Sequence, residues 1–173
     1  CIILLYIMLE ENKSNYFPSI YIIGAQKAGT TTLYNWLKQD SRLQFPKIKE
    51  THYFSSNYHY GENWYLKQFK GDNNKIKCEA DPSYIFTPNA IKRILSVSKS
   101  PKFIILLRKP IDRSYSHYLM SKYRGYEKLS FVESLDNEKK RINSEGNSKL
   151  LNYSYLRRSE YAMQIKNILG LVS

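Results

Sequence analysis

The sequence predicts a three-layer α/β protein in which helices flank a central parallel sheet. Continuous apolar runs at 19–23 and 102–107, and less continuous ones at 43–45 and 76–80, alternate with longer stretches of helical spacing. Such runs are typical of strands buried on both faces, and strands that alternate with helices form parallel sheets with right-handed crossovers. Ligands of these sheets bind beyond the carboxyl ends of the strands.

Helices are expected between and after these runs, because apolar residues recur there at spacings of three and four. Thr87 and Pro88 supply a cap and a first-turn proline. Ser130 and Glu133 form a capping-box signature, and Gly170 indicates a C-terminal stop. The expected helices are 30–39, 88–97, 111–123, 130–142 and 156–169.

The composition is that of one basic domain. A chain of 173 residues can bury one core, whereas two domains would be cramped. The 27 Lys and Arg against 15 Asp and Glu give a net charge of +12, which predicts attraction to nucleotide phosphates, acidic glycans or nucleic acid. Cys1 and Cys78 have no Cys or His partner at ligand spacing, so neither a disulfide framework nor a zinc cluster is predicted.

Residues 1–15 form a leader of unclear role ahead of the domain predicted for 16–173. The apolar run 1–9 is too short to span a membrane, because a helix rises only about 1.5 Å per residue. This run is either a strand of the core or the stump of a longer signal anchor. Membrane association is expected only through such an anchor.

The strongest candidate site is the loop between the first apolar run and the first expected helix. Free backbone N–H groups and the helix dipole both attract an anion at such a junction. In the ATP-type loop G-x-x-x-x-G-K-[ST] the lysine follows the second glycine, but Thr30 occupies that position here. The loop's lysine, Lys27, precedes Gly29 by two residues, which argues against a standard kinase or ATPase. Three successive hydroxyls add donors that can hold a 5′-phosphate without a metal: Thr30, Thr31 and Thr32.

The run 21–37 resembles the 5′-phosphosulfate-binding loop of sulfotransferases that use 3′-phosphoadenosine-5′-phosphosulfate (PAPS) as donor. Their Lys-x-Gly-Thr-Thr core binds the 5′-phosphate and the sulfate bridge. Arg108 ends the run 102–107 and Ser116 follows eight residues later, a spacing with which this family binds the 3′-phosphate. An arginine fork can hold a phosphate with two hydrogen bonds, and a serine on a helix can donate a third. The resemblance implies a P-loop-like fold and these donor-binding residues: Lys27, Ala28, Gly29, Thr30, Thr31, Thr32, Arg108 and Ser116.

The segment 49–54, KETHYF, is similar to the Lys-Glu-x-His-Phe-Phe motif of heparan sulfate sulfotransferases and their bacterial relatives. The resemblance implies that Glu50 is the general base, which takes the acceptor proton as the new S–O or S–N bond forms. It also implies that Lys27 neutralises the departing phosphate and that His52 orients Glu50 or contacts the acceptor. By itself, a glutamate beside a lysine is typical of a solvated surface pair.

Two further segments depart from the family. Residues 78–84 are similar to Glu-Lys-Ser-Pro-x-Tyr, which borders the acceptor cleft, but Ala80 replaces the lysine of several glycosaminoglycan-modifying members. This replacement weakens the case for heparan sulfate as acceptor. Arg157, Arg158 and Tyr161 resemble a later helix of the family, but Ser159 stands where a glycine is expected, and we interpret this helix as mostly structural.

The sequence therefore predicts transfer of a sulfuryl group from PAPS to a hydroxyl or amino group of a carbohydrate or other small molecule, with no metal and no nucleic acid. Two alternatives stay open: a module that binds a nucleotide or polyanion without catalysis, and a P-loop kinase, which would need a magnesium-binding acid after a strand. The resemblance covers about 18–170 and implies a further strand and a basic loop beyond it, so the domain is expected to be incomplete at its C-terminus. A bacterial member would be cytoplasmic and a eukaryotic one would lie in the Golgi lumen; the oligomeric state is not predicted.

Overall fold

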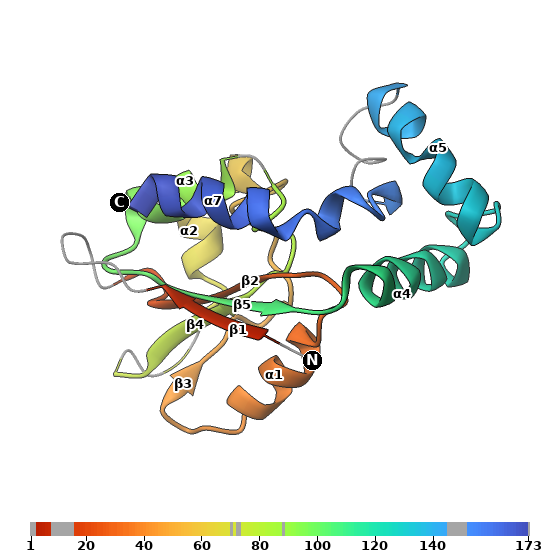
Figure 1. Ribbon diagram of the computed structural model, residues 1–173. Helices are drawn as coiled ribbons and strands as arrows, with labels where there is room; N and C mark the ends of the chain where they lie inside the picture. The colour runs from red at the N-terminus through yellow and green to blue at the C-terminus, as the bar shows by residue number, and fades with distance from the viewer. Residues whose placement is uncertain are drawn as a thin grey trace.

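A five-stranded sheet of order β1-β5-β2-β4-β3 forms the centre of the protein (Figure 1). The computed structural model describes residues 3–7, 16–69, 71, 74–87, 89–144 and 152–172. Strands β2 to β5 are mutually parallel, which confirms the predicted parallel sheet, and β1 pairs antiparallel with β5. Part of the leader thus adds an edge strand to the sheet. The strands are β1 (Ile3–Ile7), β2 (Ile20–Gly24), β3 (Leu43–Gln44), β4 (Ile76–Ala80) and β5 (Lys102–Leu107).

Helices lie on both faces of the sheet, as predicted for a three-layer fold. Figure 1 shows α1 on one face and α2, α3 and α7 on the other, whereas α4 and α5 extend away from the end of β5. No helix in the described part of the chain combines the length and the apolar character needed to cross a membrane. The helices are α1 (Thr30–Leu37), α2 (Gly61–Leu66), α3 (Ala90–Val97), α4 (Pro110–Tyr123), α5 (Phe131–Ser144) and α7 (Tyr161–Val172), with 3₁₀ turns η1 (Tyr58–Tyr60) and η2 (Arg157–Ser159).

The central strand β2 is buried on both faces. Because successive side chains of a strand point to opposite faces, Tyr21 and Ile23 enter one core cluster and Ile22 enters the other. All three are fully buried. At the end of this strand, a Cβ on Gly24 would lie 2.4 Å from Cγ2 of Ile85, so the backbone leaves the sheet where no side chain fits. The loop that follows therefore starts from a rigid support.

Local sequence signals predicted one helix start correctly and misplaced other helix ends. The predicted capping box is confirmed, since the Ser130 N–H donates to Glu133 Oε2 at 2.9 Å and the Glu133 N–H donates to Ser130 Oγ at 3.4 Å. The predicted stop at Gly170 is wrong, because α7 continues to Val172. The predicted helix 156–169 is also divided, since η2 ends before Glu160 and α7 begins after it.

The start of α3 also differs from the prediction. The helix begins at Ala90, and its N-cap is Asn89 in the left-handed conformation with φ 65°. The predicted cap at Thr87 is wrong, because its hydroxyl donates to the carbonyl of Ser83 at 2.9 Å instead. Pro88 lies outside the described residues. The hydrogen bond from the Thr87 hydroxyl to the Ser83 carbonyl thus closes a turn before the helix starts.

Candidate active site

A cleft of about 1080 Å³ lies beyond the carboxyl ends of the parallel strands. The segment after each parallel strand supplies lining residues, as expected for an open parallel sheet. Helix α4 adds Ser116 to the lining. Residues far apart in sequence therefore meet here for a topological reason: Lys27 follows β2, Glu50 follows β3, Ser83 follows β4 and Arg108 follows β5.

The loop after β2 is a tight turn at the start of α1. The Ala25 N–H donates to the carbonyl of Leu106 at 2.8 Å, which fixes the loop to β5. Lys27 and Gly29 both have positive φ, 70° and 99°. Gly29 is the N-cap of α1, so no capping side chain satisfies the first-turn N–H groups. This arrangement leaves backbone donors and the positive helix end available to an anion.

The structure brings most, but not all, of the predicted donor residues to the cleft. Ala28 is buried in the core cluster between the sheet and α1, and its N–H already donates to the carbonyl of Ala25 at 3.1 Å. Thr32 is exposed and does not line the cleft. The predicted donor residues that line it are Lys27, Gly29, Thr30, Thr31, Arg108 and Ser116.

One end of the cleft, which we call the donor end, gathers three cations: Lys27, Arg108 and Arg124. Arg108 Nη1 donates to the carbonyl of Lys27 at 3.3 Å, which connects the two predicted phosphate-binding segments. Burial lowers the pKa of Lys27, and the charges of Arg124 and Arg108 lower it further. These like charges repel each other. Binding of an anion at the donor end is therefore electrostatically favourable, because the anion offsets this repulsion.

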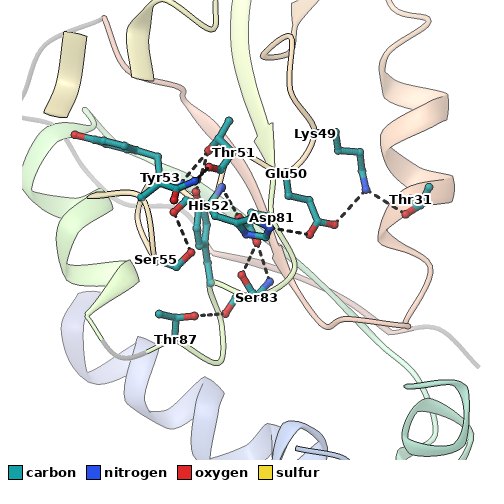
Figure 2. Close-up of polar contacts among 12 residues, drawn as sticks. Thr31, Lys49, Glu50, Thr51, His52, Tyr53, Ser55, Asp81, Ser83 and Thr87 are labelled. Carbon is teal, nitrogen blue, oxygen red and sulfur yellow. Dashed lines mark hydrogen bonds and ion pairs between the residues drawn. The ribbon is translucent and has the colours of Figure 1, made fainter. Parts of the chain in front are cut away.

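The other end, which we call the acid end, is a connected chain of polar groups (Figure 2). His52 Nδ1 lies 2.8 Å from Asp81 Oδ2, and the His52 N–H donates to the same oxygen at 3.0 Å. His52 Nε2 lies 3.9 Å from Glu50 Oε2. Lys49 Nζ donates to Glu50 Oε1 at 3.3 Å and to Thr31 Oγ1 at 3.2 Å. The acid end is therefore tied directly to the first turn of α1.

The surroundings of Glu50 favour its action as a base. Burial raises the pKa of Glu50, and the nearby charge of Asp81 raises it further, while Lys49 and His52 act in the opposite direction. The hydrogen bond to Asp81 raises the pKa of His52. A carboxylate with a raised pKa takes a proton more readily than a solvated one, so Glu50 is better suited to general-base chemistry than a surface glutamate.

A buried carboxylate holds the segment 50–52 in place. Glu79 accepts hydrogen bonds from Tyr65 at 2.5 Å, from Tyr84 at 3.0 Å and from Thr51, the residue between Glu50 and His52. Burial raises the pKa of Glu79 to about 7. The position of the candidate base thus depends on a fully buried network one residue away.

Glu50, His52 and Asp81 also have the composition of a three-ligand metal set. One potential ligand atom from each lies within 4.8 Å of the others. Asp81 contacts the His52 ring and accepts three further bonds, from the His52 N–H and from the N–H and hydroxyl of Ser83, and these contacts account for the same closeness. The closeness of these groups therefore has an explanation in hydrogen bonding alone.

Several lining or supporting residues were not among the predicted site residues, and three of them carry charge at or behind the cleft: Asp81, Arg124 and Arg158. Asp81 lay inside a recognised segment, but its bond to His52 depends on the fold. Arg124, the C-cap residue of α4, is eight residues beyond Ser116, with Met120 between them, and this spacing of four and eight was the available signal. Arg158 lines the cleft from a segment that was interpreted as structural.

The fold is that of an α/β protein with a cleft, lined partly by cations, at the ends of its parallel strands. A family model gives this class a name. The model described as "Sulfotransferase domain" matches residues 17–160. The chain therefore belongs to the sulfotransferase domain family.

Individual relatives agree with this assignment. The chain is 38% identical over 115 residues to the membrane-associated sulfotransferase kil1 of Dictyostelium discoideum, covering 64% of this chain and 24% of that protein. It is 32% identical over 133 residues to heparan sulfate glucosamine 3-O-sulfotransferase 3A1 of Mus musculus, covering 73% of this chain and 33% of that protein. The chain thus spans about a quarter to a third of the length of these curated relatives.

A solved structure is similar over most of the fold. The crystal structure of a sulfotransferase from Alicyclobacillus acidocaldarius superposes with a TM-score of 0.78 and 28% sequence identity. The match covers 90% of this chain and 69% of the other. The three-layer architecture is therefore that of a sulfotransferase.

Proposed function

We propose that this chain carries the donor site and the catalytic base of a sulfotransferase that moves a sulfuryl group from PAPS to a carbohydrate acceptor. The observation that supports this most directly is the division of one cleft into a cationic donor end and an acid end that contains Glu50. The 5′- and 3′-phosphates of PAPS are anions that the cations of the donor end can bind. The hydroxyl or amine of an acceptor carries the proton that Glu50 at the acid end can take.

In the proposed step, the acceptor oxygen or nitrogen attacks sulfur in line with the bond to the 5′-phosphate. A new S–O or S–N bond forms, the acceptor proton passes to the carboxylate of Glu50, and the old S–O bond breaks. Its electron pair stays on the phosphate oxygen, and adenosine 3′,5′-bisphosphate leaves. Lys27 stabilises the charge that grows on this oxygen, so its contribution increases toward the transition state.

The two phosphates are assigned to different segments. Lys27 and the first turn of α1 would bind the 5′-phosphate through a cation and backbone N–H groups. Arg108 and Ser116, which line the same cleft from β5 and α4, would bind the 3′-phosphate. The hydrogen bond from Arg108 to the Lys27 carbonyl supports a shared ligand for the two segments.

A carbohydrate acceptor is supported by the relatives. Several of the similar proteins are named for heparan sulfate, some as glucosamine 3-O-sulfotransferases and others as bifunctional N-deacetylase/N-sulfotransferases. At the position where several such members carry a lysine, this chain has Ala80, which is buried in the core. We therefore propose a carbohydrate without assigning heparan sulfate.

Thermal unfolding with three ligands tests this function against its alternatives. We expect adenosine 3′,5′-bisphosphate to raise the unfolding temperature and ATP with magnesium to leave it nearly unchanged, because a ligand stabilises only the state that binds it. Stabilisation by ATP with magnesium alone would instead support a kinase. Stabilisation by heparin but by neither nucleotide would support a polyanion-binding module.

A further inference from the structure

Arg158 is a buried cation that the proposed mechanism does not use. Its side chain belongs to η2, lines the cleft and is 3% exposed. Its Nε has no hydrogen-bond partner among the described residues. The guanidinium lies 4.5 Å from the centroid of the Phe86 ring, which provides stacking but no hydrogen-bond acceptor in the plane of the fork. A buried charge without a partner is costly, so this group calls for an explanation.

Arg113, a buried arginine in the same region, differs from Arg158 in the hydrogen bonds that its side chain donates. Arg113 is fully buried, donates to Ser159 Oγ at 2.6 Å and also donates to the carbonyl of Tyr155. These bonds connect α4 to the chain around η2. Arg158 has no comparable set of bonds among the described residues, although it lies in the same cluster of segments.

Arg158 lines the cleft and interacts electrostatically with charged groups of its acid end. Burial lowers the pKa of Arg158 to about 9, and Arg113 lowers it further, while Asp81 and Glu50 act in the opposite direction. Arg158 and Lys27 both contribute to lowering the pKa of the buried imidazole of His117. Arg158 is thus within electrostatic reach of the acid end and of a group that Lys27 also influences, and it remains a cation at neutral pH.

We propose that Arg158 binds the oxygens of the sulfonate group of the bound donor, between Lys27 and Glu50. The proposal rests on the function proposed above, since a sulfuryl group in transit must lie between the departing phosphate and the base. Two N–H groups of a guanidinium match two oxygens of a sulfonate, and binding this anion would supply the missing partner. An acidic group of the acceptor is the other possible source of such an oxyanion, and the test separates the two.

The experiment compares the affinities of PAPS and adenosine 3′,5′-bisphosphate, which lacks the sulfonate, by isothermal titration calorimetry. Wild type and the matched control R157Q, whose arginine is adjacent but exposed, should prefer PAPS. R158Q should keep its affinity for the bisphosphate and lose about tenfold in affinity for PAPS, as expected for a lost charge-assisted hydrogen bond. R158K, which keeps the charge without the fork, should recover part of the preference.

Thermal unfolding without ligand gives an independent readout. R158M should unfold at the same temperature as wild type or higher, because it removes an unpaired buried charge and can still pack on Phe86. The proposal is overturned if the R158 variants keep the wild-type ratio of the two affinities, whether or not they are less stable. It is also overturned if only the affinity for an acidic saccharide falls. If wild type binds neither nucleotide, the proposed function fails first and the role of Arg158 falls with it.

Discussion

The donor end and the acid end of the cleft are organised in opposite ways. At the donor end, Lys27, Arg108 and Arg124 bring like charges together, and a hydrogen bond runs from the Arg108 guanidinium to the backbone carbonyl of Lys27. At the acid end, Glu50, His52 and Asp81 form a connected chain with a lysine and a buried carboxylate behind it. Like charges dominate the donor end, whereas hydrogen bonds and ion pairs hold the acid end together.

This difference bears on how each end contributes to the reaction. Groups that are held in position before the substrate arrives need no reorganisation in the transition state, which is the usual source of large catalytic effects. Groups that repel each other contribute mainly by attracting the ligand and the developing charge. Changes at the acid end should therefore alter turnover or the framework that supports it, and changes at the donor end should alter nucleotide affinity.

Glu50→Gln should have the largest effect. Removing a general base lowers the rate by about 10²–10⁴-fold, and we expect this loss in sulfate transfer from labelled PAPS with nucleotide affinity little changed. In wild type, kcat/KM should rise with pH through the pKa of Glu50, which lies above that of an ordinary glutamate. Glu62→Gln, at an exposed glutamate of α2, is the control. Transfer at the wild-type rate by the Glu50 variant would remove this residue from the mechanism.

Glu79, which supports the acid end, should make the free energy of unfolding depend on pH. A carboxyl whose pKa is raised to about 7 in the folded state binds a proton that the unfolded chain has released. The free energy of unfolding should therefore fall as the pH rises from about 4.5 to 7, by on the order of 3 kcal/mol for this group. Glu79→Gln should lose that part of the slope in denaturant titrations at several pH values. Equal slopes in the two proteins would show that Glu79 does not carry the proton.

Arg108→Ala should weaken binding at the donor end with little effect on the acid end. Hydrogen bonds to charged groups contribute about 1.5–3 kcal/mol, so the affinity for adenosine 3′,5′-bisphosphate should fall by about 10–100-fold. Lys109→Ala removes the same charge from the next residue, which is exposed and does not line the cleft. An equal loss in both variants would mean that net charge, rather than a specific contact, accounts for the affinity.

Much of the fold could be predicted because its central strands have a strong local signal. The run that became β5 was predicted with its observed bounds, since the five consecutive apolar positions after Lys102 leave few alternatives to a buried strand. Helix α2 was not predicted, because the aromatic residues around it pack in several directions rather than along one stripe. The helix ends that were wrong, at Thr87 and Gly170, depend on contacts and propensities that compete with simple capping rules.

The candidate site was predictable where side-chain chemistry and strand ends coincide. Lys27, Glu50 and Arg108 meet in one cleft because parallel strands end at the same edge. Ala28 could not be placed by sequence, since the turn geometry at Lys27 decides which side chain faces the core. The family resemblance around Arg158 did not indicate that this side chain lines the cleft, because its burial against Phe86 results from a contact between distant segments.

Asp81→Asn should have the smallest effect. This variant tests whether the hydrogen bonds of Asp81 position His52 at the acid end. Asp81 accepts bonds from the ring and the backbone of His52, so the change should lower the pKa of His52 and loosen its ring. It should also lower the pKa of Glu50, because the charge of Asp81 raises it. Loss of one hydrogen bond to a charged group corresponds to about tenfold in rate, and we expect that loss in kcat with KM little changed. The pKa of His52 can be followed by NMR titration of its imidazole. Ser83→Ala removes a different partner of Asp81 and should leave that pKa near wild type. If Asp81→Asn lowers neither the rate nor the pKa, the acid end owes its order to Glu79 and Lys49 instead.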